Sequence, residues 1–338
     1  MKVALRYLCI IAATLIFSGS NHAQADQSEV KILLGKPLGY LTLQVMQYNH
    51  IFEKQAAAHG VPGLKVTYIT NMTGGNAVDA ILSGSVDIAQ YSPDVLINLW
   101  SKTAGTPNEI RGIVAKGAVQ EVLVTRNPNV HSMGDFTDSD RIAVGGVKTS
   151  AAAMWIEMAT AKALGEANFD KLDHLTVNAA SADGYAQLIS PISQVTAFFA
   201  VPPFSYLALA QANIHKVLTS DEAMGARASS GVEFSTKKFH DANPKLIAAF
   251  IDAMKEAGSL IMHDRAAATI AYRVESGDTT TPQEIIDKFL DDPNTDFDPT
   301  PKGIMIYADF MYEHGLIKRK PASWKDVFFP EAYGFNGN

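Results

Sequence analysis

Apolar strand patterns and helical segments alternate along this chain, and the alternation occurs in two separate stretches. The first stretch runs from residue 30 to residue 89, with strand patterns at 30–34, 64–69 and 86–89 and helical spacing between them. A repeated strand–helix–strand order predicts a parallel sheet with crossover helices. The pattern begins again at residue 121, so the sequence predicts two α/β units. The length of 338 residues exceeds that of one average domain, which also favours two domains.

The second unit and the last third of the chain are predicted from the same kind of evidence. The strand patterns of the second unit lie at 121–125, 141–144, 174–177, 195–199 and 214–218. Helical patterns lie at 41–58 and 75–82 in the first unit, and at 150–164 and 185–189 in the second. The last third is mostly helical. Asn243 before Pro244 favours a helix start, as does the capping-box pattern Thr281-Pro282-Gln283-Glu284. We therefore expect an α/β protein with additional C-terminal helices.

The first 25 residues have the order of a secretory signal peptide. Lys2 and Arg6 are basic, residues 8–17 are apolar, and Ala23-Gln24-Ala25 has the small-x-small pattern of a cleavage site. Ten apolar residues are too few to span a bilayer, and Cys9 lies inside the run rather than after it, which disfavours a lipid anchor. We expect residues 1–25 to be removed on export to a bacterial periplasm. A short buried N-terminal helix is the less favoured alternative.

The composition argues against several classes of protein. Lys and Arg total 28 against 35 Asp and Glu, and a net charge of −7 argues against a nucleic-acid partner. Cys9 is the one cysteine, so the exported chain would have none, which excludes a disulfide scaffold, a thiol nucleophile and cysteine-ligated metals. The nine histidines are scattered, and no zinc-protease or nucleophile-elbow motif occurs. The sequence therefore predicts no catalytic residue, metal ligand or cofactor.

The loops that follow the predicted strands are the candidate ligand-binding sites. The carboxyl ends of parallel strands meet at one edge of a sheet, where open α/β folds bind ligands. Glycines in these loops allow close approach to the backbone, and the N–H groups at a helix start attract anions. Ordinary turns and N-caps are the alternative interpretation. The candidates are Lys36, Gly39, Tyr40, Asn71, Thr73, Gly74, Gly75, Asn76, Gln90, Tyr91 and Ser92 in the first unit, and Lys148, Thr149, Ser150, Asp183 and Pro202 in the second.

Three segments resemble one protein family. They are residues 74–88 with Tyr91-Ser92-Pro93 after them, residues 141–150, and residues 243–250. Their order and spacing are similar to those of the periplasmic substrate-binding proteins of the nitrate, sulfonate and taurine ABC transporters. These proteins share a domain type with the thiamine-pyrimidine (NMT1/THI5-like) proteins. Residues 191–206 depart from the family pattern, because they contain no acidic residue and no tryptophan.

The resemblance implies a bilobal periplasmic-binding-protein fold of type II, in which extended hinge segments join two α/β domains. We place lobe 1 at residues 26–117 and 225–338, with the C-terminal helices, and lobe 2 at residues 118–224. The hinges are expected near 114–120 and 224–232. In such a protein a small-molecule ligand closes the lobes by contacting both. The resemblance also implies a monomer that delivers its ligand to an ABC permease in the inner membrane.

The charge of the ligand stays open at this stage. A small organic anion, such as a sulfonate, a taurine-like compound or a carboxylate, is favoured by the predicted helix starts and by Lys36 and Lys148, with Lys148 as the candidate charge partner. Tyr40 and Tyr91 are placed to stack on a flat ligand. The alternative is a neutral or cationic heterocycle, such as a thiamine pyrimidine precursor, which inward-pointing acids such as Asp79, Asp94 or Asp183 would favour.

Two further classes are disfavoured. A pyrimidine-synthase-like enzyme resembles this domain type but depends on cysteines, which the exported chain would lack. A periplasmic sensor domain would be followed by a membrane-spanning or signalling segment, and the sequence has no second long apolar run. Binding and transport, without chemistry on the ligand, is therefore the predicted function.

Overall fold

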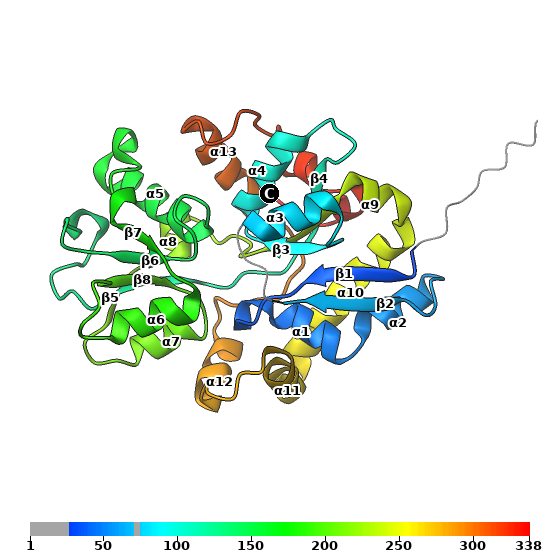
Figure 1. The fold of residues 1–338 in the computed structure, drawn as a ribbon, viewed down its shortest axis with the longest axis horizontal. Coiled ribbons are helices and arrows are strands. Elements are labelled where there is room, and N and C mark those ends of the chain that lie inside the picture. The colour runs from blue at the N-terminus through cyan, green and yellow to red at the C-terminus, as the bar shows by residue number, and fades with distance from the viewer. Residues whose placement is uncertain (1–26, 71–74) are drawn as a thin grey trace, which may run out of the picture.

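The chain forms two α/β lobes that lie side by side (Figure 1). The computed structural model describes residues 27–70 and 75–338. The predicted signal peptide, residues 1–25, lies outside the described residues. The predicted α/β class with two lobes is confirmed.

The first lobe contains a mixed sheet rather than the purely parallel sheet that the sequence predicts. Strands β1 (Glu29–Leu33) and β2 (Lys65–Ile69) are parallel, as expected. A parallel bridge between Ile32 and Ile88 connects β1 to the second group of strands. That group has the order β3-β10-β4, with β3 at Ala89–Tyr91, β10 at Val232–Thr236 and β4 at Ile110–Ala115. Strand β10 is antiparallel to both neighbours because it enters the sheet on the return from the other lobe.

The helices of the first lobe come from both ends of the chain. They are α1 (Leu41–Tyr48), α2 (Ile51–Ala58), α3 (Gly75–Ser83), α4 (Pro93–Thr103), α9 (Lys237–Ala242), α10 (Pro244–His263), α11 (Arg265–Ser276), α12 (Gln283–Asp291) and α13 (Ile304–Glu313). The single helix predicted at 41–58 is wrong. It is broken between α1 and α2, where His50 adopts a left-handed conformation with φ of 52°. The sequence analysis also missed α4 and β4.

The second lobe contains a five-stranded sheet with the order β7-β6-β8-β5-β9. The strands are β5 (Val122–Thr125), β6 (Ile142–Val144), β7 (Thr176–Asn178), β8 (Ala197–Ala200) and β9 (His215–Thr219). Its helices are α5 (Ala151–Leu164), α6 (Ser181–Ile189), α7 (Phe204–Leu209) and α8 (Ser220–Met224). This sheet is also mixed, because β5 is antiparallel to β8 and β9. The predicted helix at 150–164 is confirmed almost residue for residue.

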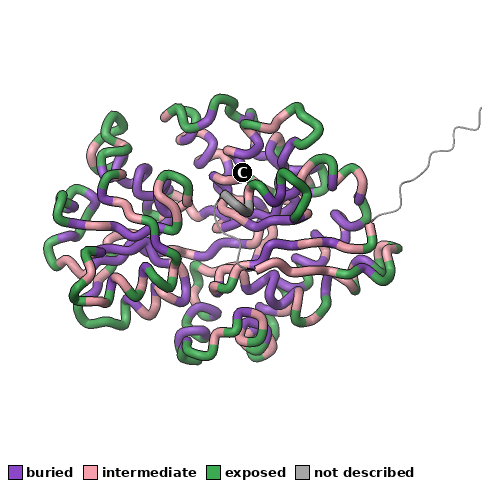
Figure 2. Tube along the Cα trace, in the orientation of Figure 1, coloured by how far each residue is buried: buried purple, intermediate pink, exposed green. Residues whose placement is uncertain are grey.

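Short 3₁₀ helices complete the structure. They are η1 (Leu38–Tyr40), η2 (Met133–Asp135), η3 (Glu166–Asn168), η4 (Asp173–Leu175), η5 (Trp324–Val327) and η6 (Pro330–Gly334). The strands form the buried interior of each lobe, and the outer helix faces and loop tips are exposed (Figure 2). One apolar cluster spans both lobes, since it contains Phe234 of β10, Trp155 of α5 and Tyr307 of α13. The two lobes are therefore in direct contact.

Three stretches of chain run side by side at the junction of the lobes. The chain leaves β4 through residues 116–121 to reach β5, and it returns from α8 to β10 through residues 225–231. The backbone N–H of Lys116 donates to the carbonyl of Gly231 (3.1 Å). A third stretch, between α12 and α13, joins them through reciprocal backbone hydrogen bonds of Ala118 and Asp296 (3.2 and 2.8 Å). The sequence predicted two connecting segments but not the third.

Candidate functional site

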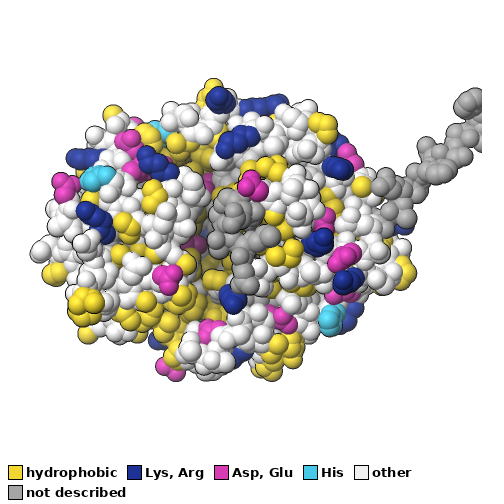
Figure 3. Space-filling view, viewed as in Figure 1, with side chains coloured by type: hydrophobic (Ala, Val, Ile, Leu, Met, Phe, Trp, Pro, Cys, Tyr) yellow, Lys and Arg dark blue, Asp and Glu magenta, His cyan; other side chains and the backbone are white. Residues whose placement is uncertain are grey.

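The surface is hollowed along the line between the two lobes (Figure 3). On the first lobe, Tyr40 stands at the start of α1, and Gln90 and Tyr91 end β3. On the second lobe, residues 201–203 join β8 to α7. The hydroxyl of Tyr206 in α7 donates to Asp292, which directly follows α12, so the second lobe contacts the first lobe there. The strand ends of both lobes thus face one interlobe cleft, as open α/β sheets commonly arrange.

Four charged residues gather where the connecting stretches meet the first lobe. We call Asp94, Lys116, Glu121 and Glu233 the floor cluster. Glu233 of β10 is fully buried, and Asp94, in the first turn of α4, is 5% exposed. The charges of Glu121 and Glu233 influence the pKa values of both Lys116 and Tyr40, so the four side chains lie within range of one another's charge. The floor cluster therefore contains three acids and one base, and Lys116, Glu121 and Glu233 are the members that act on Tyr40.

Lys116 is held against the first lobe. Its Nζ donates a hydrogen bond to the carbonyl oxygen of Gly39 (2.8 Å) and lies 5.5 Å from the centroid of the Tyr40 ring. Burial lowers the pKa of Lys116, and the negative charges of Glu121 and Glu233 oppose that effect. The ammonium group is thus engaged by a backbone carbonyl and an aromatic face.

Several buried acceptor atoms in and beside the floor cluster have no partner. Neither carboxylate oxygen of Glu233 receives a hydrogen bond from another described residue, and the same holds for Gln90 Oε1 and Asp94 Oδ1. Glu233 and Gln90 are register partners on the antiparallel strands β10 and β3, so their side chains are neighbours on one face of the sheet. Buried polar atoms are normally satisfied, because leaving one unpaired costs about 1–3 kcal/mol. These atoms therefore mark a place where a ligand is expected to donate.

Burial shifts the pKa values of the three acids upward. Desolvation raises the pKa of Glu233 and of Glu121 above the ordinary value of 4.5, and Lys116 offsets part of each shift. Burial also raises the pKa of Asp94 to about 6, against hydrogen bonds that lower it. A buried carboxylate favours its protonated form unless a positive charge compensates it. Burial therefore disfavours the charged form of each of these acids.

Two tyrosines of the first lobe are partly buried beside the floor cluster. Tyr40 packs closely against Gly35, where an added Cβ would lie 2.2 Å from its ring. Tyr91 lies beside Phe234, with ring centroids 6.3 Å apart. Burial raises the pKa of both tyrosines, so their hydroxyl groups stay protonated at neutral pH.

The predicted binding residues of the first unit fall into three groups. Gly39, Tyr40, Gln90 and Tyr91 lie together beside the floor cluster, and Ser92 precedes α4 as its N-cap residue. Lys36 is exposed. Asn71, Thr73 and Gly74 lie outside the described residues, and Gly75 and Asn76 begin α3.

The predicted residues of the second unit lie mainly at the surface. Lys148 is 65% exposed and forms an ion pair with Asp173 (3.2 Å). Thr149 is exposed, and Ser150 caps α5 by accepting a hydrogen bond from the N–H of Ala153 (3.3 Å). Asp183 is exposed on α6, and Pro202 is buried after β8. Lys148 thus has an acidic partner of its own.

The sequence analysis did not identify Lys116, Glu121 or Glu233. Glu233 interrupts the apolar strand Val232-Glu233-Phe234, and Lys116 directly follows the apolar residues 113–115. A charged residue inside a buried strand pattern is uncommon unless it is paired or functional. This local signal was available in the sequence, but the grouping of the side chains was not.

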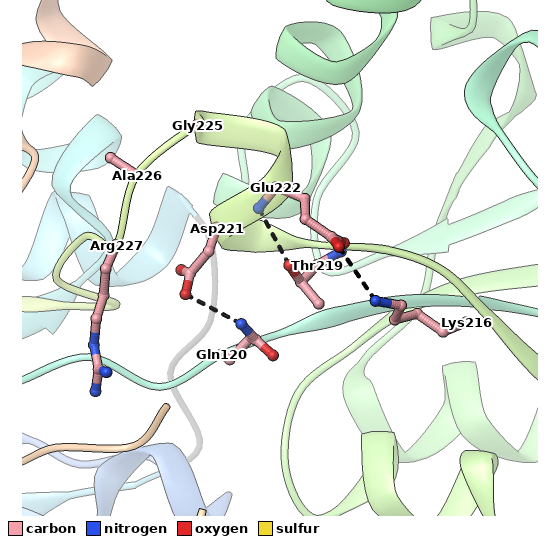
Figure 4. Close-up of a pocket in the computed structure, with 8 residues that line it drawn as sticks. All are labelled: Gln120, Lys216, Thr219, Asp221, Glu222, Gly225, Ala226 and Arg227. Carbon is pink, nitrogen blue, oxygen red and sulfur yellow. Dashed lines mark hydrogen bonds and ion pairs between the residues drawn. The ribbon is translucent and has the colours of Figure 1, made fainter. Parts of the chain in front are cut away.

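A cavity of about 530 Å³ lies beside the connecting stretches (Figure 4). Its lining residues are Gln120, Lys216, Thr219, Asp221, Glu222, Gly225, Ala226 and Arg227. Most of its polar groups satisfy one another: Gln120 donates to Asp221 (3.1 Å), Lys216 pairs with Glu222 (3.2 Å), and Arg227 pairs with Asp296 (2.9 Å). The buried Nε of Arg227 has no hydrogen-bond partner among the described residues. This cavity is a weaker candidate site than the interlobe cleft.

Two searches of the described residues gave negative results. Within residues 27–70 and 75–338, no three His, Cys, Asp or Glu side chains converge in an arrangement that would hold a metal ion. Over the same part of the chain, none of the helices combines the length and apolarity needed to cross a bilayer.

Comparisons with known proteins specify the family to which this two-lobed chain belongs. Residues 54–292 match the model of the substrate binding domain of the ABC-type glycine betaine transport system. That match covers most of the chain, and the chain belongs to this family. The family is one of transport binding domains, so the coarser part of the predicted resemblance is confirmed. The thiamine-pyrimidine subgroup is not confirmed.

Solved structures agree on the fold. The alkanesulfonate-binding protein SsuA from Xanthomonas axonopodis pv. citri, bound to MOPS, has a TM-score of 0.67 at 18% identity over 87% of this chain and 96% of its own. The periplasmic aliphatic sulphonate binding protein SsuA from Escherichia coli has a TM-score of 0.67 at 17% identity, with coverages of 89% and 99%. The periplasmic nitrate-binding protein NrtA from Synechocystis PCC 6803 has a TM-score of 0.60 at 17% identity, with coverages of 78% and 70%. At these identities the likeness concerns the fold alone. No curated protein matches the sequence significantly.

Proposed function

We propose that this protein is the periplasmic solute-binding component of an ABC importer, and that it binds a small organic cation or zwitterion between its lobes. The family and the fold support solute binding. The predicted signal peptide and the periplasmic relatives support the location. We propose further that the protein acts as a monomer and delivers its ligand to an inner-membrane permease, and the description of the family as part of an ABC-type transport system supports the delivery.

The charge of the floor cluster is the observation that carries the ligand class. Glu121 and Glu233 are the acids whose charges act on Lys116, and Asp94 is a further buried acid whose charge acts on Glu121. Buried acceptor atoms of Glu233, Gln90 and Asp94 have no partner among the described residues. A cation would compensate this negative charge in a region of low dielectric, where charge interactions are stronger than in water. Inward-pointing Asp94 is also the feature that favours the cationic alternative raised from the sequence. Glycine betaine is the first zwitterion to test, because the family is described by it.

The organic anion expected first from the sequence has less support. Lys148 forms its ion pair with Asp173, and Lys36 is exposed. Lys116 is the lysine of the floor cluster, and it is engaged with Gly39 and Tyr40. An anion placed beside Glu233 and Glu121 would meet repulsion rather than a free positive charge.

The connecting stretches support a closing motion. We propose that residues 114–120 and 224–232 act as hinges between lobe 1 (26–117 and 225–338) and lobe 2 (118–224). The third stretch, before α13, runs alongside them and is hydrogen-bonded to residue 118. A ligand that contacts both lobes shifts the protein toward the closed state by its differential affinity for that state.

Thermal shift measurements on residues 26–338 test the proposal. The panel contains amines, glycine betaine, pyrimidines, sulfonates, carboxylates and nitrate. A ligand at about 100 times its Kd adds about 2.7 kcal/mol to the free energy of unfolding. We expect cations or zwitterions to raise the melting temperature. A shift from anions alone, abolished by Lys148→Ala, would refute the proposed ligand class and restore the anion hypothesis.

The charge of Glu233 is tested separately. Glu233→Gln removes one negative charge with little change in shape, and it is expected to weaken a cationic ligand at least tenfold. Glu313→Gln makes the same change at an exposed position at the end of α13 and serves as the matched control. Equal effects of the two variants would count against a role for the floor cluster.

A further inference from the structure

We propose that the cationic group of the ligand carries N–H donors, as a primary or secondary ammonium or a protonated amino-heterocycle does, and that a quaternary ammonium is discriminated against. This inference rests on the proposed function, and it specifies the chemistry of the same site. It differs from what the description of the family suggests, because glycine betaine has no N–H group on its nitrogen.

The unpartnered atoms beside the floor cluster are the first observation. Glu233 is fully buried and Gln90 is 2% exposed, and they are register partners on neighbouring strands. Three of their side-chain oxygens, Glu233 Oε1 and Oε2 and Gln90 Oε1, receive no hydrogen bond within the described part of the chain. All three atoms are acceptors. A ligand that brings N–H groups to these atoms would satisfy them.

The position of Lys116 is the second observation. Its ammonium group lies 5.5 Å from the centroid of the Tyr40 ring, within the range of a cation–π interaction. Its Nζ donates to Gly39, and it forms no ion pair with Glu233 or Glu121 among the described residues. The aromatic face next to the floor cluster is thus already occupied by a cation of the protein. A quaternary ammonium, which is recognised mainly by aromatic faces, would have to displace Lys116.

Hydrogen bonding then decides between cations of equal charge. An N–H cation makes charge-assisted hydrogen bonds to the oxygens of Glu233 and a further one to Gln90. An N-methylated analogue keeps the charge but leaves the same oxygens buried and unpaired. A site that hydrogen-bonds its substrate rejects analogues without the donor more strongly than an apolar pocket rejects a change of size. We expect affinity to fall about tenfold for each donor lost.

Two N-methylation series test the inference by isothermal titration calorimetry on the wild-type protein. The first is glycine, sarcosine, dimethylglycine and glycine betaine, and the second is ethanolamine, its mono- and dimethyl derivatives, and choline. Within each series the number of N–H donors falls stepwise while the positive charge is kept. We expect Kd to rise along at least one series. Tightest binding by glycine betaine or choline, equal affinity within the series, or no binding by any of the eight compounds would overturn the inference.

Two variants connect the preference to the named side chains. Glu233→Gln replaces one acceptor oxygen by an NH₂ group and is expected to reduce the ratio of Kd values between the ends of the series. Glu313→Gln is the control and is expected to leave that ratio unchanged. The titrations of the wild-type protein with the two N-methylation series still test the inference if Glu233→Gln does not fold. Anions as the only ligands in the broader panel would refute the proposed function itself, whereas a cation-binding protein that prefers quaternary nitrogen would refute the N–H inference alone.

Discussion

A buried hydrogen bond between the lobes offers a direct test of how the cleft closes. Trp155 of α5 belongs to the second lobe, and its Nε1 donates to the hydroxyl of Tyr307 in α13 at 2.9 Å. Helix α13 packs on α4 of the first lobe. Trp155 is 2% exposed and Tyr307 is fully buried. If the lobes separate, both groups reach water, so this bond contributes to the closed arrangement and not to the separated one.

The substitution Tyr307→Phe removes the acceptor and leaves the indole N–H of Trp155 buried without a partner. Such a change costs about 1–3 kcal/mol in a buried site. The substitution destabilises the closed state but not the open state. The equilibrium constant for closing therefore falls by about 5–150-fold. When the free protein is mainly open, the apparent Kd of any ligand that closes the lobes rises by the same factor.

The assay combines calorimetric Kd values with the radius of gyration from small-angle X-ray scattering, with and without ligand. Tyr272→Phe is the control, because the hydroxyl of the buried Tyr272 donates a part-buried hydrogen bond to Asp278 at 2.6 Å, and both residues belong to the first lobe. Both variants should lower the melting temperature, and only Tyr307→Phe should weaken the ligand. An unchanged Kd for Tyr307→Phe beside a lowered melting temperature would refute the role of this bond in closure.

Two further predictions concern the floor cluster and the connecting stretches. The raised pKa of Glu233 and of Asp94 means that the folded protein without ligand binds more protons than the unfolded chain, so its free energy of unfolding should fall as pH rises from about 5 to about 8. A cationic ligand should bind more tightly over the same rise, and Glu233→Gln should flatten both dependences in urea unfolding and calorimetry. Gly117→Ala should lower the free energy of unfolding by about 2 kcal/mol or more, because φ is +103° and the added Cβ would lie 2.1 Å from the carbonyl oxygen of Asp296. Gly334→Ala, where no atom lies within 4 Å of the added Cβ, is the control in urea unfolding, and equal losses would contradict the explanation.

The fold class was predictable because its signals are local. The helix predicted at 150–164 is observed at Ala151–Leu164, since Ser150 is a favourable N-cap and apolar residues follow at helical spacing. Helix α4 also had a local signal, Ser92 before Pro93, but that segment was interpreted as a loop. The break at His50 had no such signal, because a left-handed residue that is not glycine or asparagine depends on its surroundings.

Strand direction and the floor cluster were not predictable in this way. Strand β10 pairs antiparallel with β3 and β4 because the chain reaches it from the other lobe, which is a property of the whole path of the chain. Glu233 and Gln90 are distant in the sequence and become neighbours only through that pairing. Lys148 had the local context of a ligand-binding lysine, but Asp173, which comes from η4, is its partner in the structure. Charged partners therefore depend on tertiary contacts that the sequence pattern does not contain.

Ligand preference and lobe closure depend on different side chains: the floor cluster determines the preference, and the contacts between the lobes determine the free energy of closure. The floor cluster lies beside the connecting stretches, where rotation of the lobes changes distances least. The Trp155–Tyr307 bond and the bond from the Tyr206 hydroxyl to Asp292 (2.7 Å) join the lobes away from Glu233 and Gln90. A change at the contacts between lobes should therefore multiply the Kd of every ligand by one factor. A change at Glu233 should alter the ratios between ligands, because it alters which donors are satisfied. Measuring both N-methylation series on Tyr307→Phe and on Glu233→Gln tests this separation. A changed ratio in Tyr307→Phe, or a uniform factor in Glu233→Gln, would show that closure and recognition depend on the same contacts.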